Sequence, residues 1–248
     1  MEIIRVRDLD VGYGREVVLR RMNFAIDRGR VTVVVGESGS GKSTLLKTLI
    51  GLLPPLAGEV FLGGERIDFA SERNLGRLFR RIGVLYQNSA LLGSLSLFDN
   101  IALPIRMHHR DWPKAEETAR VGAMLERVGL RGAEAKFPFE LSGGMRKRAA
   151  LARAMVLQPD LIFCDEPSAG LDPITSAGLD ELLRDLQSRH GVTFVVVTHE
   201  LRSISRIADR VLLIRDGAIR YDGEFADLSA SGDPYVHAFF LRKADHDH

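Results

Sequence analysis

The sequence predicts an α/β fold with a mostly parallel central sheet, an N-terminal antiparallel β-subdomain and an inserted helical subdomain. Four short apolar runs without polar alternation are typical of parallel strands that helices cover on both faces. Two glycine-containing turns predict hairpins. Between Gln87 and Pro159 the pattern changes from strand-like to helical. Within one domain of residues 1–248 we expect residues 1–87 and 160–230 to form the β-subdomain and core, 88–159 the helical subdomain, and 231–248 a C-terminal tail.

The central strands are expected at the four apolar runs, which are Val31–Val35, Ile82–Tyr86, Leu161–Cys164 and Phe194–Val197. Gly36 and Ser43 bracket a loop after the first run, and Ser43–Ile50 then has a helical pattern that Gly51 and Pro54 end.

Antiparallel strands are expected over the rest of the first eighty residues. Glu59–Leu62 and Glu65–Ile67 flank Gly63-Gly64, and Val211–Ile214 and Ala218–Tyr221 flank Asp216-Gly217.

Two helices are expected in the helical subdomain. One has Asp111 as its cap and Pro113 in its first turn, and it runs through Val128 to Gly129. The other begins at Ser142 and stops before Pro159.

Composition and charge argue against a nucleic-acid-binding, a secreted and a membrane-spanning protein. The 248 residues are 45% hydrophobic and 27% charged, which is ordinary for a globular protein, and the net charge of +1 gives no field that would attract nucleic acid. Cys164, in an apolar run, is expected to be a buried thiol. The N-terminus carries charges where a signal peptide needs its apolar segment, and no apolar run approaches the ~20 residues of a membrane span. We therefore expect a cytosolic protein that reaches a membrane only through a partner.

A phosphate loop follows the first central strand, because residues 36–43 match G-x-x-x-x-G-K-[ST] in full. Its glycines let backbone N–H groups surround phosphate oxygens, and the next helix adds positive potential. Lys42 is expected to reach the β- and γ-phosphates, and the Ser43 hydroxyl to bind Mg²⁺. The expected ATP-binding residues here are Gly36, Glu37, Ser38, Gly39, Ser40, Gly41, Lys42, Ser43 and Thr44.

Two acids end the strand Leu161–Cys164, at the sheet edge where such folds bind ligands. Asp165 is suited to hold Mg²⁺ through water, and Glu166 to polarise the attacking water. Taken alone, the pair is equally typical of a solvated acidic turn.

The signature loop (residues 141–145, LSGGM) opens the second expected helix. Ser142 can cap it, and Gly143 and Gly144 leave backbone N–H groups unobstructed, so the helix N-terminus predicts a second anion site. An ordinary glycine-rich helix start is the alternative. We expect the two anion sites of one chain to serve different nucleotides, which requires a dimer.

At these residues the chain resembles, over nearly its whole length, the ATP-binding subunits of ABC transporters. The resemblance implies an ABC-type P-loop ATPase that uses ATP and Mg²⁺, with Glu166, His199, Gln87 and Lys42 as catalytic residues and Ser43, Gln87 and Asp165 at the metal. It implies that Tyr13 stacks on adenine, although Tyr13 is also typical of a turn aromatic. It implies a head-to-tail homodimer in which Ser142, Gly143, Gly144 and Met145 close on the partner's ATP while an interface loop crosses between subunits, formed by Ala169, Gly170, Leu171 and Asp172.

The chain departs from the motifs common to ABC ATPases in two places, and these departures resemble one group within the family. The signature loop ends in Met145 instead of Gln, and DEPSAGLDPITS replaces the usual DEPTSALD. With SALLGSLSLFDNIALPIR after Gln87 and the closing DPYVHAFF, the chain resembles the ATPases of MCE-type lipid transporters, including the Mla phospholipid system. This implies a multispanning permease, an MCE-domain lipid-binding protein and often a small STAS-domain protein as partners, at the cytoplasmic face of the inner (plasma) membrane.

Other functions stay open at this point. An ordinary ABC solute importer is the main alternative, and a non-transport ABC protein of DNA repair or translation is another. A P-loop kinase or GTPase fails to explain LSGGM. Two groups of polar residues are expected to face solvent. Arg146–Arg148 are expected to form an exposed helix face instead of a nucleic-acid patch, and His246 and His248 to lie in a solvated tail instead of a metal site.

Overall fold

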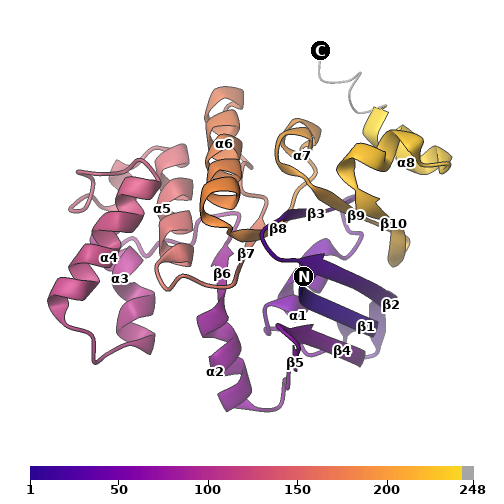
Figure 1. The fold of residues 1–248 in the computed structure, drawn as a ribbon, viewed down its shortest axis with the longest axis horizontal. Coiled ribbons are helices and arrows are strands. Elements are labelled where there is room, and N and C mark those ends of the chain that lie inside the picture. The colour runs from indigo at the N-terminus through magenta and orange to yellow at the C-terminus, as the bar shows by residue number, and fades with distance from the viewer. Residues whose placement is uncertain (242–248) are drawn as a thin grey trace.

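The computed structural model describes residues 1–241 and contains two sheets (Figure 1). The smaller, four-stranded sheet is antiparallel, with the strand order β2-β1-β4-β5. Its strands are β1 (Glu2–Tyr13), β2 (Glu16–Asp27), β4 (Ala57–Leu62) and β5 (Glu65–Arg66). The predicted hairpin at Gly63-Gly64 is confirmed, since Leu62 pairs with Glu65.

The six-stranded central sheet has the order β10-β9-β3-β8-β7-β6, and every neighbouring pair is parallel except β10 with β9. All four predicted central strands are confirmed, as is the hairpin at Asp216-Gly217. The strands are β3 (Val31–Gly36), β6 (Ile82–Leu85), β7 (Leu161–Asp165), β8 (Thr193–Val197), β9 (Arg210–Arg215) and β10 (Ala218–Glu224).

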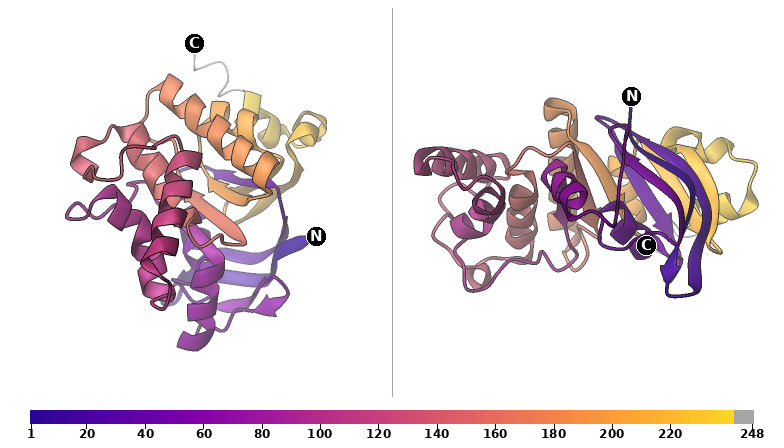
Figure 2. Two further views of the ribbon diagram at one scale, coloured as in Figure 1. Left: turned by 60° about the vertical axis from the view of Figure 1, so that its left-hand side comes forward. Right: turned by 90° about the horizontal axis from the view of Figure 1, so that it is seen from below.

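Helices surround the central sheet, and α3, α4 and α5 form a group to one side of it (Figures 1 and 2). The helices are α1 (Lys42–Leu49), α2 (Glu72–Arg81), α3 (Leu97–His108), α4 (Lys114–Arg127), α5 (Gly143–Met155), α6 (Pro173–His190), α7 (Leu201–Ile207) and α8 (Pro234–Leu241). Two 3₁₀ turns are η1 (Pro138–Glu140) and η2 (Phe225–Ala230).

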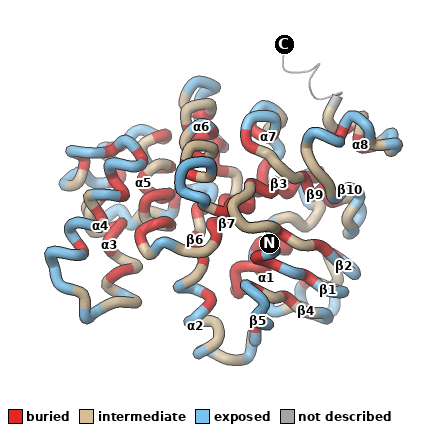
Figure 3. Tube along the Cα trace, in the orientation of Figure 1, coloured by how far each residue is buried: buried red, intermediate tan, exposed pale blue. Residues whose placement is uncertain are grey.

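Two apolar cores lie on opposite faces of the central sheet. Val33 belongs to the core shared with α3–α7, whereas Val34 belongs to the core shared with the antiparallel sheet and α1. Because successive side chains of a strand point to opposite faces, β3 is buried along its whole length (Figure 3). Cys164 is buried in the first core, and burial raises the pKa of its thiol to about 12.

Helix α5 lies directly against strand β6 as well as against α3 and α4. A Cβ added at Gly83 would lie 2.3 Å from the carbonyl oxygen of Ala154, so only glycine permits this approach. The helix that begins at the signature loop is therefore anchored to the edge of the central sheet.

Three expectations about secondary structure are wrong. The first eighty residues include α2, which Ser71 caps by accepting a hydrogen bond from the backbone N–H of Asn74. The helical subdomain contains a further helix, α3, whose cap is Ser96 and which tolerates Pro104 inside it. Asp111 is not a cap: the N-cap position of α4 is Pro113, which makes no side-chain capping bond, because Trp112 directly before the proline avoids the helical region and stacks on His109 instead.

The region expected to be a tail contains helix α8, and His246 and His248 lie outside the described residues. Between residues 1 and 241, no helix combines the length and the apolar character that crossing a membrane requires.

Candidate active site

Parallel register brings the chemically important loops to one edge of the central sheet. Val34 pairs with Val197, Val197 with Asp165, and Leu85 with Cys164. The phosphate loop, Glu166, His199 and Gln87 all follow the carboxyl ends of these strands, where the structure brings the predicted catalytic residues together.

Lys42 lies over the phosphate loop. Its ammonium donates hydrogen bonds to the carbonyl oxygens of Gly36 and Glu37, at 2.9 and 2.7 Å, and approaches Ser40 Oγ at 3.4 Å. Helix α1 begins directly after Gly41 without a side-chain cap, so its first N–H groups are left for an anion. Glu37, Ser38, Gly39 and Ser43 are exposed around this centre, and Thr44 is buried.

The second residue of the phosphate loop is held from the C-terminal end of the described chain. Tyr235, on α8, donates its hydroxyl hydrogen to Glu37 Oε1 at 2.7 Å, and the Arg215 guanidinium lies 3.6 Å from the centre of the tyrosine ring. Burial and the bond to Glu37 raise the pKa of Tyr235 to about 12, so the hydroxyl keeps its proton near neutral pH. No pattern in the sequence predicts this contact.

Glu166 and His199 form a hydrogen-bonded pair, with 2.7 Å between Glu166 Oε1 and His199 Nδ1. When the carboxylate is ionised, Nδ1 is the donor of this bond, because an ionised carboxylate only accepts. The second carboxylate oxygen, Oε2, is buried and has no hydrogen-bond partner. Glu166 adopts a left-handed backbone with φ of 46°, and its N–H donates to the Val197 carbonyl at 2.8 Å. The neighbouring Asp165 has its pKa raised, first by burial and then by the charge of Glu166.

Lys147 is buried, so the expectation of an exposed face at Arg146–Arg148 is wrong for this residue. Its ammonium donates to the backbone carbonyls of Gln87 and Glu166, the latter at 3.2 Å. Burial lowers the pKa of Lys147. Helical periodicity predicts this position, because Lys147 shares the buried face of α5 with Gly144, Ala150 and Leu151.

The signature loop of the chain packs against its own interface loop. Ser142 caps α5 as expected, accepting a hydrogen bond from the Met145 N–H at 3.2 Å. A Cβ at Gly144 would lie 2.4 Å from Thr175 Cγ2, so this glycine is needed for packing as well as for an open backbone. Asp172 ends the interface loop by capping α6. Gly170 and Asp172 are exposed, and Ala169 and Leu171 are half-buried.

Tyr13 lies beside α1, where it is about half exposed. Lys47 Nζ approaches its hydroxyl at 3.3 Å, and hydrogen bonds with Thr44 and Lys47 lower its pKa. The ring is therefore next to the phosphate loop. Helix α5, with the signature loop at its start, lies apart from α1 in both Figures 1 and 2.

A family model described as ABC transporter matches residues 19–169 of the chain. This match spans the phosphate loop, the signature loop and the acidic strand.

The chain belongs to the ABC transporter family.

Curated relatives of this ABC ATPase match along almost its whole length. The intermembrane phospholipid transport system ATP-binding protein MlaF of Escherichia coli is 40% identical over 98% of this chain and 90% of the relative. The protein of the same name from Haemophilus influenzae is 40% identical over 98% and 92%. The probable ribonucleotide transport ATP-binding protein mkl of Mycobacterium tuberculosis is 41% identical over 95% of this chain but 66% of the relative.

Solved ABC structures have the same fold. The protein cbiO1 from Clostridium perfringens, part of the ABC transporter complex cbiONQ, has a TM-score of 0.86 at 28% identity, covering 99% of this chain and 98% of that one. The dimeric ATP-binding cassette MJ0796 bound to ADP and Pi has a TM-score of 0.80 at 28% identity, covering 90% and 98%. The present chain is accordingly an ATP-binding and ATP-hydrolysing subunit.

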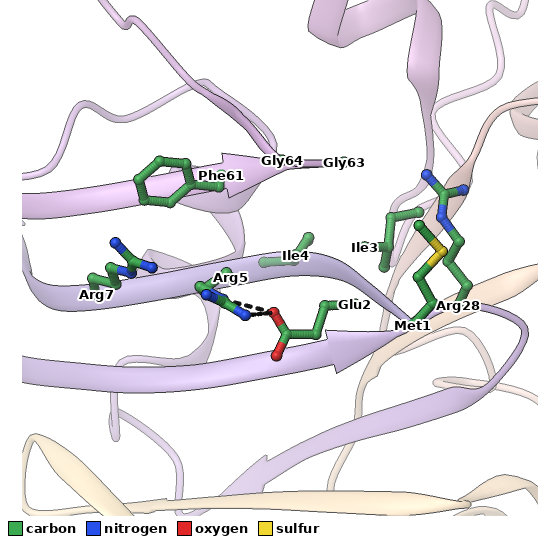
Figure 4. A pocket seen from close by; sticks show the side chains of 10 residues that line it. All are labelled: Met1, Glu2, Ile3, Ile4, Arg5, Arg7, Arg28, Phe61, Gly63 and Gly64. Carbon is green, nitrogen blue, oxygen red and sulfur yellow. Dashed lines mark hydrogen bonds and ion pairs between the residues drawn. The ribbon is translucent and has the colours of Figure 1, made fainter.

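A pocket of about 370 Å³ lies on the antiparallel sheet of this ABC ATPase, where it is lined by residues of β1, β4 and the turns beside them (Figure 4). Its arginines already have partners: Arg5 pairs with Glu2, Arg7 lies 5.2 Å from the centre of the Phe61 ring, and Arg28 pairs with Asp160 at 3.0 Å. Arg28 and Asp160 precede β3 and β7, whereas the catalytic residues follow these strands. The pocket is therefore not part of the ATP site.

Replacing Gly41 with alanine tests the phosphate loop. Gly41 has φ of 96°, and a Cβ there would lie 2.8 Å from Leu19 Cδ2, so Gly41→Ala must displace the loop. We expect ATP affinity to fall by about tenfold or more, which corresponds to about 1.4 kcal/mol. Titration with a fluorescent ATP analogue measures this. Gly64→Ala is the matched control, because Gly64 has φ of 86° with no atom within 4 Å. Equal ATP affinities of the two variants would contradict the assignment.

Proposed function

We propose that the chain energises an MCE/Mla-type ABC transporter that moves phospholipid or a related lipid between membranes. The observation that carries the proposal is the match, end to end, with ATP-binding proteins named for intermembrane phospholipid transport. The relative named for ribonucleotide transport is covered over a smaller share of its length. Met145 and the 168–172 segment, the departures noted in the sequence, favour the same assignment.

The proposed partners follow from this assignment. Two copies of the chain form a homodimer with twofold symmetry and act with a multispanning permease, an MCE-domain lipid-binding protein and, in some systems, a small STAS-domain protein. The subunit is peripheral, at the cytoplasmic face of the inner membrane, and contacts the membrane only through the permease. The net charge of +1 argues against a nucleic-acid substrate.

We assign the metal site to Ser43, Gln87 and Asp165. The residues fit Mg²⁺, because Asp165 is a partly buried carboxyl whose pKa burial and a neighbouring carboxylate raise, an environment that a cation relieves. When bound, Mg²⁺ neutralises charge on the β- and γ-phosphate oxygens.

In the proposed reaction, water attacks the γ-phosphorus of ATP and the bond to the β-phosphate oxygen breaks, which yields ADP and phosphate. In this proposal the proton of that water goes to Oε2 of Glu166, which is buried and has no hydrogen-bond partner in the structure. His199 is hydrogen-bonded to Oε1 and thereby orients the carboxylate, and we assign it the contact with the γ-phosphate. Lys42 exchanges its loop carbonyls for phosphate oxygens, and the Tyr13 ring stacks on adenine.

Closure of the dimer completes each site in this proposal. One chain supplies the phosphate loop and Glu166, and its partner supplies Ser142 and the amides of Gly143, Gly144 and Met145. Since α1 and α5 lie apart within one chain, a single chain does not bring its own signature loop to its own phosphate loop. ATP binds the closed dimer better than the open one, and hydrolysis releases it. Gln87 and the helical subdomain, residues 88–159, carry the motion to the permease.

Replacing Glu166 with glutamine is expected to reduce kcat by at least about 100-fold, because an amide accepts a proton poorly. ATP binding remains, so the variant accumulates as an ATP-bound dimer. Phosphate release and size-exclusion chromatography with ATP measure both effects. Glu181→Gln, at an exposed position of α6, is the control. Near wild-type turnover in Glu166→Gln would show that the role is misassigned.

Replacing Ser142 with arginine is expected to block closure and hydrolysis while ATP binding by each monomer stays within about twofold of wild type. Ser142→Ala separates this effect from the lost helix cap, which costs about 1 kcal/mol of stability without adding bulk. Dimerisation with ATP is measured by analytical ultracentrifugation. Loss of ATP binding by the Ser142→Arg monomer is the outcome that contradicts the geometry.

The cargo is tested by purifying the intact complex from native membranes and identifying its proteins and bound small molecules by mass spectrometry. We expect a permease, an MCE-domain protein and phospholipid. A soluble solute-binding protein, or bound ribonucleotide without lipid, would reject the lipid assignment in favour of a solute importer.

A further inference from the structure

Lys147 is a buried ammonium whose hydrogen bonds join two functional loops. The residue is 4% exposed, on the second turn of the helix that begins at the signature loop. Its Nζ donates to the backbone carbonyls of Gln87 and Glu166. Burying an ammonium costs free energy that an apolar side chain of the same length would not, so packing alone does not account for a lysine here.

The Glu166 backbone needs support on both sides. Its φ of 46° lies in the left-handed region, which a residue with a Cβ adopts only where its surroundings hold it. The Val197 carbonyl accepts the hydrogen bond of its N–H, and Lys147 donates to its carbonyl. These two bonds fix the peptide groups on either side of Glu166, and hence the direction of the carboxylate toward His199.

Helix α5 also holds the loop that begins at Gln87. Arg153 donates to the carbonyls of Ser89 and Ala90, at 2.9 and 2.7 Å, and both of these residues have positive φ. Together with Lys147, the helix bonds three carbonyls of this loop. The contact of α5 with Gly83 keeps the helix fixed against strand β6.

We propose that Lys147 is a positioning residue that sets Glu166 and Gln87 relative to the signature helix. It would thereby link the ATP site of its own chain to the signature loop that closes on the partner's ATP. The proposal rests on the dimeric mechanism proposed above. When the signature loop engages the partner's ATP, any shift of α5 reaches Gln87 and Glu166 through one ammonium.

Replacement of Lys147 by methionine removes the donor and keeps the length of the side chain. We expect kcat to fall about tenfold or more while KM for ATP stays within about twofold, because both acceptors of Lys147, the carbonyls of Gln87 and Glu166, lie outside the phosphate loop. The Hill coefficient of ATP hydrolysis is expected to fall toward one. Arg148→Met is the matched control: this arginine of the same helix also donates to two carbonyls, those of Val128 and Gly178, neither of which lies in an ATP loop.

The role of Lys147 is tested by steady-state ATP hydrolysis of the purified wild type and variants. Thermal unfolding midpoints are measured in parallel. Equal kcat losses in Lys147→Met and Arg148→Met would overturn the proposal, since both would then reflect general destabilisation. Lys147→Arg, which keeps hydrogen-bond donors, is expected to retain a third or more of the wild-type kcat. A loss of kcat as large as that of Lys147→Met would also overturn the proposal.

If the methionine variant does not fold, Lys147→Gln takes its place, and wild-type kcat and Hill coefficient in that variant overturn the proposal. Failure of the wild type itself to hydrolyse ATP would instead refute the proposed function.

Discussion

The rest of the structure depends on the parallel pairing of β3, β8, β7 and β6. A parallel ladder places all carboxyl ends at one edge, and the paired positions Val34–Val197, Val197–Asp165 and Leu85–Cys164 set the relative heights of the loops that follow. A slip of one residue in any pair would turn every side chain of that strand to the other core. The register therefore fixes the fold and the active-site geometry together.

Much of this arrangement could be predicted from the sequence, because strands buried on both faces leave an uninterrupted apolar pattern, and a phosphate loop has a fixed spacing. Helix α2 was missed although Leu75, Leu78 and Phe79 have the i, i+3, i+4 spacing of an amphipathic helix and Ser71 is a typical cap, a pattern that could have identified it. Asp111 was misplaced because an Asp shortly before a proline is typical of a helix start, whereas Trp112, directly before Pro113, avoids the helical region, so the helix begins only after the proline. The buried position of Lys147 follows from its helical phase, but its two acceptors are backbone atoms, which no sequence pattern identifies.

In the proposed dimer, helix α5 connects residues that contact two different nucleotides. Its first residue follows the serine cap of the signature loop, its middle reaches Glu166 and Gln87 through Lys147, and its end approaches Gly83. A helix is stiff along its axis over this length, so it transmits displacement better than a loop would. The chemistry of one ATP and the docking of the other thus share a single rigid element.

The hydrogen bond from Tyr235 to Glu37 has a consequence for the order in which the molecule is made. The phosphate loop and its first helix leave the ribosome early, and domains fold from the N-terminus as synthesis proceeds. Tyr235 is made almost two hundred residues later, and Arg215 precedes it only by twenty. A nascent chain can therefore contain the full G-x-x-x-x-G-K-S sequence while its second residue still lacks the side chain that holds it. The phosphate loop therefore gains this hydrogen bond only after the 198 residues that separate Glu37 from Tyr235 have been made.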